Sequence, residues 1–310
     1  MTQTGTGKYE RLLERCRGLE PIPTAVAYPC EETALTGAIG AAKSGMIIPI
    51  LVGPATTIAV VAKAKGIDLG GVEVVDVADS RAAAAKAVEF VRSGKAELLM
   101  KGSLHSDEIL AAVVAKDAGL RTGRRLSHAF LMDVPTYHKV LIVTDGAINI
   151  APTLEDKVDI CQNAIDLARA FGVDLPKVAI LAAVETVNSR MPATLDAAAL
   201  CKMAERGQIK GGLLDGPLAF DNAISRDAAK TKGIASDVAG DPDILLAPDL
   251  EAGNMMAKQL SFLANADSAG LVLGARVPVI LTSRADSLRS RIASTAVAVL
   301  AAHARRQPPC

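Results

Sequence analysis

The sequence predicts an α/β protein of two domains built around parallel β-sheets. Its 310 residues are enough for about two domains of ordinary size. Short apolar runs alternate with segments of ten or more residues that have helical character, and this alternation is typical of strand–helix–strand units with parallel strands. Between residues 128 and 146, two apolar runs are separated only by a short turn that contains Pro135. This interruption predicts a hairpin and a change of domain.

The first part of the chain alternates regularly between helices and strands. Asp79 or Ser80 is expected to cap the fourth helix, and Gly45 and Gly94 are expected to end the second and fourth. The predicted helices cover 9–18, 31–45, 55–66, 81–93 and 107–116, and the predicted strands cover 23–29, 46–53, 72–77 and 97–100.

After the predicted hairpin, formed by 128–134 and 139–146, the alternation resumes. The predicted helices cover 154–171, 193–206, 222–232, 255–264 and 292–302. The predicted strands cover 177–184, 211–216, 243–248, 269–275 and 277–281.

Composition argues against several classes of protein. The formal net charge is zero, whereas a dedicated nucleic-acid binder normally has a basic excess. The five cysteines are scattered and have no zinc-site spacing, which favours reduced thiols and a cytoplasmic location. The first residues lack the apolar core of a signal peptide, and Pro49, Gly53 and Pro54 break the longest apolar stretch, so no membrane span is expected. No GxGxxG segment follows a strand, which disfavours that mode of dinucleotide binding.

Small, polar and charged residues follow several of the predicted strands. In parallel sheets, ligands bind beyond the carboxyl ends of the strands, where helix N-termini favour anions. These residues could also have a purely structural role. On turn chemistry alone, the chance that Ser283 or Asp286 only caps the last helix is about one in two. The convergence nevertheless predicts an anion-binding α/β enzyme with a site suited to phosphate. The segments concerned are 101–103, 121–128, 145–147, 215–218, 248–254 and 283–287.

Six segments together resemble the phosphate acetyltransferase and phosphate butyryltransferase family, over nearly the whole chain. TSRADS and DGAINIAP within them are closer to the butyryl-type branch. The segments are KGSLHSDEIL (101–110), RRLSHAFLMDVP (124–135), VTDGAINIAPTLEDK (143–157), LLDGPLAFDNAIS (213–225), PDLEAGNMMAKQL (248–260) and PVILTSRADS (278–287).

The resemblance implies reversible transfer of a short acyl group from acyl-CoA to inorganic phosphate, giving acyl phosphate and CoA. It implies CoA as a substrate, no tightly bound cofactor, no metal, and a homodimer or higher homo-oligomer. It also implies a three-layer αβα fold like that of isocitrate and isopropylmalate dehydrogenases, with the active site in the cleft between two domains. The first domain would take 1–127 and 272–310, and the second, which makes the dimer contact, would take 128–271.

The resemblance also suggests roles for individual residues. It assigns the family's catalytic serine–arginine pair to Ser283 and Arg284. The aspartate proposed as a base in acetyl-type members corresponds to Ser290 here, so Asp286 becomes the candidate base of this chain. The residues expected to bind phosphate or CoA, or to line the cleft, are Lys101, Gly102, Ser103, Arg125, Asp249, Gly253 and Asn254.

Two other functions stay open at this point. One is a metal- and NAD-dependent decarboxylating dehydrogenase of the same fold, which would need His or Asp metal ligands across the cleft. The other is a non-catalytic sensor of CoA or acyl phosphate. The preferred acyl chain is also open, because acetyl, propionyl and butyryl groups differ by methylenes worth only about 1 kcal/mol each in an apolar pocket.

Overall fold

The computed structural model describes residues 7–283 and 286–306, and it divides into two compact units. The N/C unit consists of Tyr9–Arg124 and Ala269–Cys310. The middle unit consists of Met1–Lys8 and Arg125–Ser268. Each unit is built of β-strands and α-helices, so the predicted α/β class of fold is confirmed.

The strands of the N/C unit have the order β3-β2-β1-β4-β11-β10. All its strands except β10 run parallel to their neighbours, and β10 is antiparallel to β11. The carboxyl ends of β1, β4 and β11 therefore lie at one edge. The strands are β1 (Ile22–Ala27), β2 (Ile47–Gly53), β3 (Glu73–Asp76), β4 (Leu98–Lys101), β10 (Asp267–Leu273) and β11 (Val279–Ile280).

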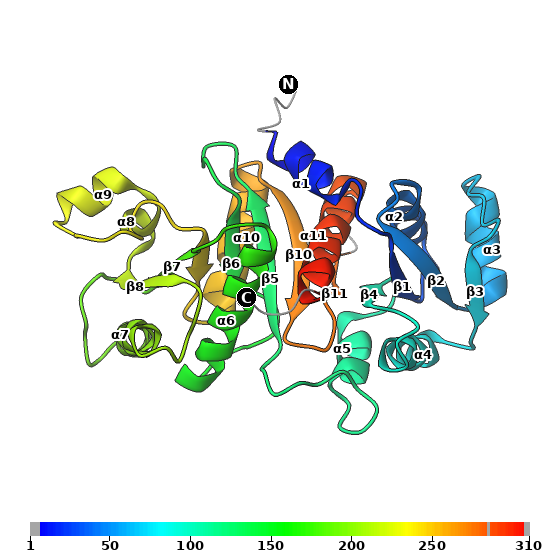
Figure 1. The fold of residues 1–310 in the computed structure, drawn as a ribbon, viewed down its shortest axis with the longest axis horizontal. Helices are drawn as coiled ribbons and strands as arrows, with labels where there is room; N and C mark the ends of the chain where they lie inside the picture. The colour runs from blue at the N-terminus through cyan, green and yellow to red at the C-terminus, as the bar shows by residue number, and fades with distance from the viewer. Residues whose placement is uncertain (1–6, 284–285, 307–310) are drawn as a thin grey trace. The chain divides into compact units, whose positions relative to one another are not determined.

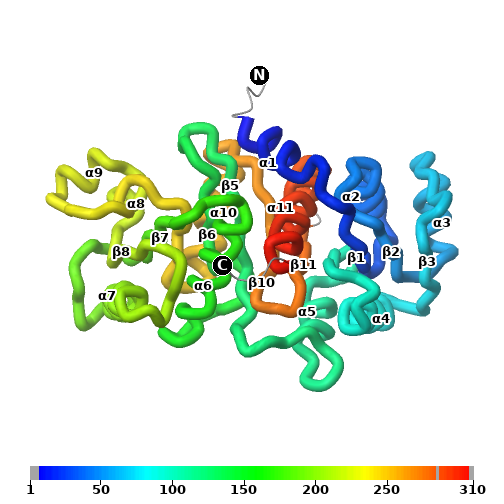
Figure 2. The backbone as a smooth tube through the Cα atoms, viewed as in Figure 1, coloured from blue at the N-terminus to red at the C-terminus, as the bar shows by residue number. Residues whose placement is uncertain are grey.

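Helices cover both faces of this sheet, with α2 and α11 on one side and α4 and α5 on the other (Figure 1). The tube in Figure 2 shows that the last strand and helix return to lie beside elements from the start of the chain. Asp79 caps α4 by accepting the N–H of Ala82 at 2.8 Å, as expected. The helices are α1 (Lys8–Cys16), α2 (Glu32–Lys43), α3 (Ala55–Ala64), α4 (Ser80–Arg92), α5 (Ser106–Val114) and α11 (Leu288–Arg306).

The middle unit has the strand order β5-β6-β9-β7-β8. Strand β5 is antiparallel to β6, which confirms the predicted hairpin, and the other neighbours are parallel. Because β5 runs the opposite way, its first residue lies at the edge where β6 ends. The strands are β5 (Ser127–Asp133), β6 (Leu141–Thr144), β7 (Lys177–Leu181), β8 (Leu213–Leu218) and β9 (Ile244–Leu246).

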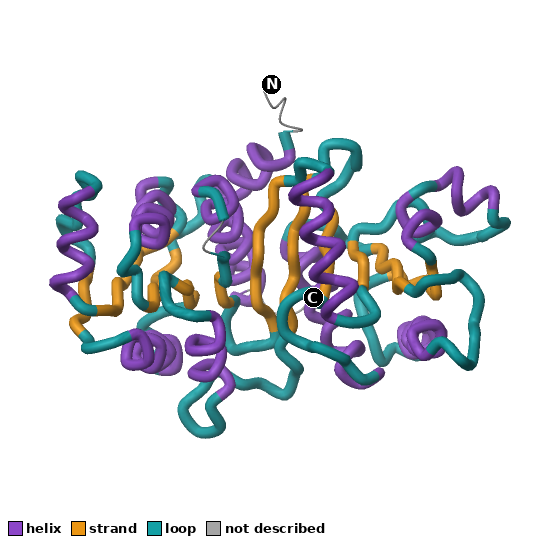
Figure 3. Tube along the Cα trace, turned by 180° about the vertical axis from the view of Figure 1, so that it is seen from behind, coloured by secondary structure: helices purple, strands orange, loops and turns teal. Residues whose placement is uncertain are grey.

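Helices also lie on both faces of the middle unit's strands, as the reverse view in Figure 3 shows. A single helix was expected over 222–232, and this was wrong. Ser225 is extended, with φ −121° and ψ 117°, and its side chain accepts the N–H of Ala228 at 3.3 Å, so a new helix starts there. The helices are α6 (Leu154–Ala170), α7 (Pro192–Glu205), α8 (Phe220–Ile224), α9 (Arg226–Thr231) and α10 (Leu250–Leu263).

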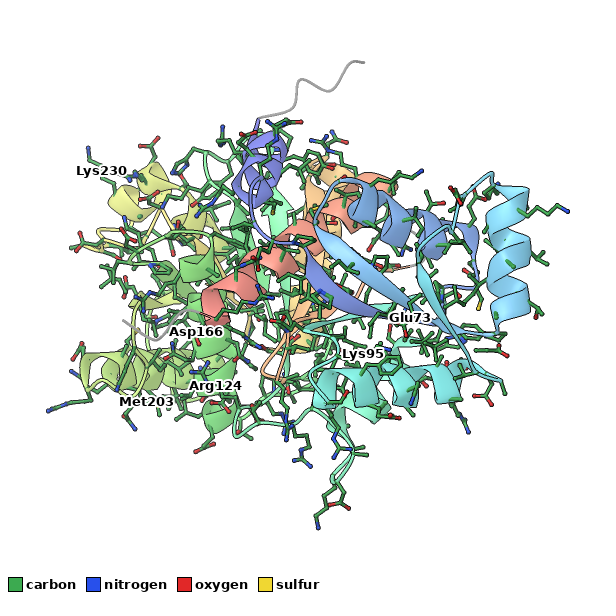
Figure 4. The ribbon with its side chains drawn as sticks, turned by 45° about the vertical axis from the view of Figure 1, so that its right-hand side comes forward. Glu73, Lys95, Arg124, Asp166, Met203 and Lys230 are labelled. Atoms are coloured by element: carbon green, nitrogen blue, oxygen red, sulfur yellow. The ribbon has the colours of Figure 1, made fainter. Side chains whose placement is uncertain are left out.

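The surface carries many charged side chains, as the sticks in Figure 4 show. Glu73 and Lys95, both labelled there, form an ion pair with 2.5 Å between Oε1 and Nζ. Such exposed pairs contribute little to stability. No helix within the described residues is both long enough and apolar enough to cross a membrane.

Candidate functional site

In the N/C unit, Lys101 is the last residue of β4, and Gly102 and Ser103 begin the loop that follows; all three are buried. A Cβ on Gly102 would lie 2.4 Å from the carbonyl oxygens of Ala27 and Tyr28, so only glycine fits beside the end of β1. Ser103 Oγ donates to the Tyr28 oxygen at 2.8 Å. Gly102 and Ser103 therefore join the carboxyl ends of β1 and β4.

At the same edge, β11 leads into the segment with the predicted catalytic pair. Thr282 is buried, whereas Ser283 is exposed. The backbone N–H of Ser283 donates to Asp286 Oδ2 at 2.7 Å, and the N–H of Asp286 donates to the Ser283 oxygen at 3.2 Å. These two bonds define a tight turn, called here the serine turn (Thr282, Ser283 and Asp286). Arg284 lies outside the described residues.

The expectation that Asp286 or Ser283 might cap the last helix was wrong. Helix α11 begins at Leu288, and Ser287 Oγ accepts the N–H of Ser290 at 3.1 Å, which is the bond of an N-cap. The carboxylate of Asp286 is directed to the Ser283 backbone instead. Ser290, at the position of the family's aspartate, is buried.

A residue that the sequence analysis did not single out, Arg291, holds the serine turn. Its Nη1 donates to Thr282 Oγ1 at 2.9 Å, and its Nη2 donates to the Ser283 carbonyl oxygen at 2.7 Å. Lys101 Nζ makes a longer contact, 3.4 Å, with the Thr282 carbonyl oxygen. Burial lowers the pKa of Arg291, while the nearby carboxylates of Asp286 and Glu31 act in the opposite direction. The feature of the sequence that could have identified Arg291 is its position, as a charged residue directly before the apolar run that starts at Ile292.

In the middle unit, the loop after β6 is organised by the buried carboxylate of Asp145. It accepts the backbone N–H groups of Ala147, Ile148 and Asn149 at 2.9, 3.1 and 3.2 Å. It also accepts Asn149 Nδ2 at 2.6 Å. A carboxylate with four donors is well satisfied and makes the loop rigid. From the sequence, Asp145 was only one of several polar residues that follow predicted strands. Its burial depends on the fold and could not be recognised from the sequence.

Arg125 is connected to this loop. Its Nε donates to Asn149 Oδ1 at 2.8 Å and lies 3.4 Å from Asp156 Oδ1. The side chain is 55% exposed, so its charge faces solvent. The chain from Asp145 through Asn149 thus orients an accessible guanidinium, a group suited to phosphate.

The start of α10 packs against the same loop. Asp249 is the N-cap of α10 and accepts the N–H of Ala252 at 2.8 Å, so the helix starts five residues before the predicted 255. A Cβ on Gly253 would lie 2.3 Å from the Asp145 carbonyl oxygen. Asn254 Nδ2 donates to the Gly146 oxygen at 2.8 Å. These residues dock α10 onto the loop.

The candidate residues therefore form two groups, one in each unit. Lys101, Gly102, Ser103, Ser283 and Asp286 gather at the carboxyl edge of the N/C sheet. The group in the middle unit consists of Arg125, Asp249, Gly253 and Asn254. Among the side chains that the structure describes, there is no group of three or more His, Cys, Asp or Glu residues placed to hold a metal ion.

The family model described as "Phosphate acetyl/butaryl transferase" matches residues 80–299. The chain belongs to this family. A phosphate acetyltransferase of Rhizobium meliloti is 62% identical over 299 residues, covering 96% of this chain and 95% of that protein. A phosphate butyryltransferase of Clostridium beijerinckii is 42% identical over 294 residues, covering 95% and 97%. The chain is thus similar to members of both branches, not only to the butyryl branch that its motifs favoured.

Solved structures agree with this family assignment. A branched-chain phosphotransacylase from Enterococcus faecalis V583 superposes with a TM-score of 0.79 at 29% identity. The match covers 91% of this chain and 99% of that one. The described fold is therefore that of a phosphotransacylase along most of its length.

Proposed function

We propose that this enzyme transfers a short acyl group reversibly between coenzyme A and inorganic phosphate. The observation that carries the proposal is family membership, combined with a serine turn at the carboxyl edge of a parallel sheet. There the exposed Ser283 is held by side-chain bonds to both its backbone N–H and its carbonyl oxygen. An acyltransferase needs such a fixed donor where charge develops on the thioester.

In the forward direction, a phosphate oxygen attacks the thioester carbonyl carbon and forms a tetrahedral oxyanion. The carbon–sulfur bond then breaks, and CoA leaves as a thiolate that takes up a proton. Ser283 donates a hydrogen bond to the thioester oxygen or to the departing sulfur. Arg284 holds the phosphate through two parallel charge-assisted bonds, which a planar guanidinium forms well. Binding both reactants together removes much of the entropic barrier.

A strong general base is not required, because phosphate near neutral pH is already largely a dianion. Asp286, the candidate base, accepts a bond from the Ser283 backbone at 2.7 Å. We propose that its main contribution is to hold the serine turn. Its role as a base stays a separate prediction.

Lys101 and Arg125 supply positive charge for phosphate or for the phosphate groups of CoA in this proposal. Gly102 and Ser103 keep the loop after β4 in place, and Gly253 lets α10 approach its loop. Asp249 and Asn254 stabilise the start of α10.

We further propose that the two units correspond to the two domains expected from the resemblance. In this view they form an arrangement like that of isocitrate and isopropylmalate dehydrogenases, with the active site in the cleft between them. A homodimer formed through the middle unit, a cytoplasmic location and the absence of a tightly bound cofactor belong to the same proposal. The relatives lend no support to a decarboxylating dehydrogenase or a non-catalytic sensor.

The test is phosphate-dependent release of CoA, followed with a thiol reagent, using acetyl-, propionyl- and butyryl-CoA in the presence of EDTA. Release that requires phosphate supports the proposal and ranks the acyl groups. Arg284→Ala is expected to abolish this release while circular dichroism stays unchanged. Folded wild-type protein that releases no CoA from any of the three substrates would contradict the proposal.

A further inference from the structure

We propose that Arg291 is a positioning residue of the acyl-transfer site. It acts by fixing the backbone that carries the hydroxyl of Ser283. The inference rests on the proposed function and concerns the same site. Arg291 is not assigned to contact the reactants. Its guanidinium instead joins Thr282 Oγ1, at 2.9 Å, to the Ser283 carbonyl oxygen, at 2.7 Å.

The geometry brings together three elements of the N/C unit. Arg291 lies in the first turn of α11, and its two acceptors lie just beyond the end of β11. Its stem passes α2 at Gly37, where an added Cβ would lie 3.2 Å from Arg291 Cδ and 3.5 Å from its Cβ. Glycine therefore leaves room for the arginine, and the guanidinium is confined on the way to its acceptors.

The burial of this charge calls for an explanation beyond stability. Arg291 is only 7% exposed, and its Nε is buried without a hydrogen-bond partner. Burying a guanidinium costs free energy unless close partners compensate, and well-packed apolar residues often serve stability equally well. The two bonds that it does form both end on the serine turn. We therefore infer that this arginine serves to hold the geometry of that turn.

Two acceptors at once require a planar, forked donor. A lysine has a single nitrogen on a flexible stem, so it cannot reproduce both bonds in the same geometry. Asp286 fixes the N–H of Ser283 and Arg291 fixes its carbonyl oxygen, so the peptide groups on both sides of the serine are held. Without Arg291, the backbone that carries the Ser283 hydroxyl would be free to move relative to the reacting carbonyl.

The experiment compares Arg291→Met, Arg291→Lys and Thr282→Val with the wild type in phosphate-dependent CoA release. Arg289→Met is the matched control, because Arg289 lies on the same helix and pairs with Glu10, 3.4 Å away. We expect Arg291→Met to lower kcat about 100-fold, the effect of misplacing a reacting group by about 1 Å. The KM for phosphate should change by less than about threefold, since the arginine does not bind it.

Arg291→Lys should recover only part of kcat, and Arg289→Met should retain wild-type kcat. The double variant Arg291→Met with Thr282→Val should be no slower than Arg291→Met alone, because both changes break the same bond. A purely structural role predicts a lower melting temperature with normal kcat well below it, and that result would overturn the proposal. Fully multiplicative losses in the double variant would also overturn it.

Hydrogen exchange of the peptide containing Thr282 and Ser283 provides a readout without turnover. Arg291→Met should speed this exchange at least about tenfold, because loss of its two bonds lets the turn open and release the Ser283 N–H from Asp286 more often, and Arg289→Met should not. If the wild type fails to release CoA but the exchange effect is present, the proposed function fails while Arg291 still fixes the turn. Unchanged exchange together with unchanged kcat would refute the role of Arg291.

Discussion

Gly253 is the position where a single added methyl group should reveal how tightly α10 is docked. A Cβ there would lie 2.3 Å from the carbonyl oxygen of Asp145 and 3.2 Å from Ala247 Cβ. The first contact is with backbone in a loop held by four hydrogen bonds, so a side-chain rotation cannot relieve it. Gly253→Ala must therefore shift the helix or the loop.

The expected size of this effect follows from two opposing terms. Overpacking of this kind costs about 3 kcal/mol, and replacing a helical glycine by alanine returns about 1 kcal/mol. The net loss of about 2 kcal/mol should lower Tm by about 4–8 °C for a cooperative unit of this size. Differential scanning calorimetry measures it directly.

Gly40, inside α2, is the matched control for this substitution. Its added Cβ would meet the ends of the Ile292 and Leu288 side chains, at 3.4 and 3.9 Å, which is ordinary contact. Gly40→Ala should therefore raise Tm by about 2–4 °C through helix propensity alone. If Gly253→Ala raised Tm as Gly40→Ala does, the close docking of α10 on the Asp145 loop would be refuted.

Two further predictions concern acidic residues. Asp286→Ala should slow turnover about tenfold, because it releases the Ser283 N–H. Asp286→Asn should keep most activity, because its amide oxygen can accept the same bond. An equal loss of activity in both variants would favour a role for Asp286 as a base instead. Burial would raise the pKa of Asp241, but hydrogen bonds from Lys177 and Lys139 outweigh it and hold this pKa well below its usual range. Its stabilising effect is thus present above the unfolded pKa of about 3.9 and is lost as pH falls further. Asp241→Asn should cost about 3 kcal/mol at pH 7 in urea unfolding, with a deficit that shrinks below about pH 4, and a deficit independent of pH would contradict this.

Much of the fold was predictable because its signals are local. Alternating apolar runs predicted the strands, and the short turn near Pro135 predicted the antiparallel pair β5 and β6. Asp79 at the start of α4 acts as the expected cap. The errors were also local. The helix expected over 222–232 is interrupted at Ser225, and α10 starts at its cap Asp249, before its first clearly apolar turn.

The site was predictable to a lesser degree, because its contacts join residues far apart in the chain. The resemblance identified Ser283, but the bond that it receives from Arg291 depends on how α11 returns to the end of β11. Likewise, the burial of Asp145 and its four donors follow from the packing of α10 and β5 around one loop. Capping propensity favoured Asp286 as a cap, whereas the structure gives that role to Ser287.

The most direct test of acyl transfer is to follow both products in one reaction. Phosphorus NMR of the purified enzyme with acetyl- or butyryl-CoA and phosphate measures acyl phosphate, and a thiol reagent measures CoA in parallel samples. The proposed reaction predicts one acyl phosphate for each CoA released, with both products lost in Ser283→Ala. CoA released without acyl phosphate would show hydrolysis of the thioester instead and would contradict the assigned transfer to phosphate.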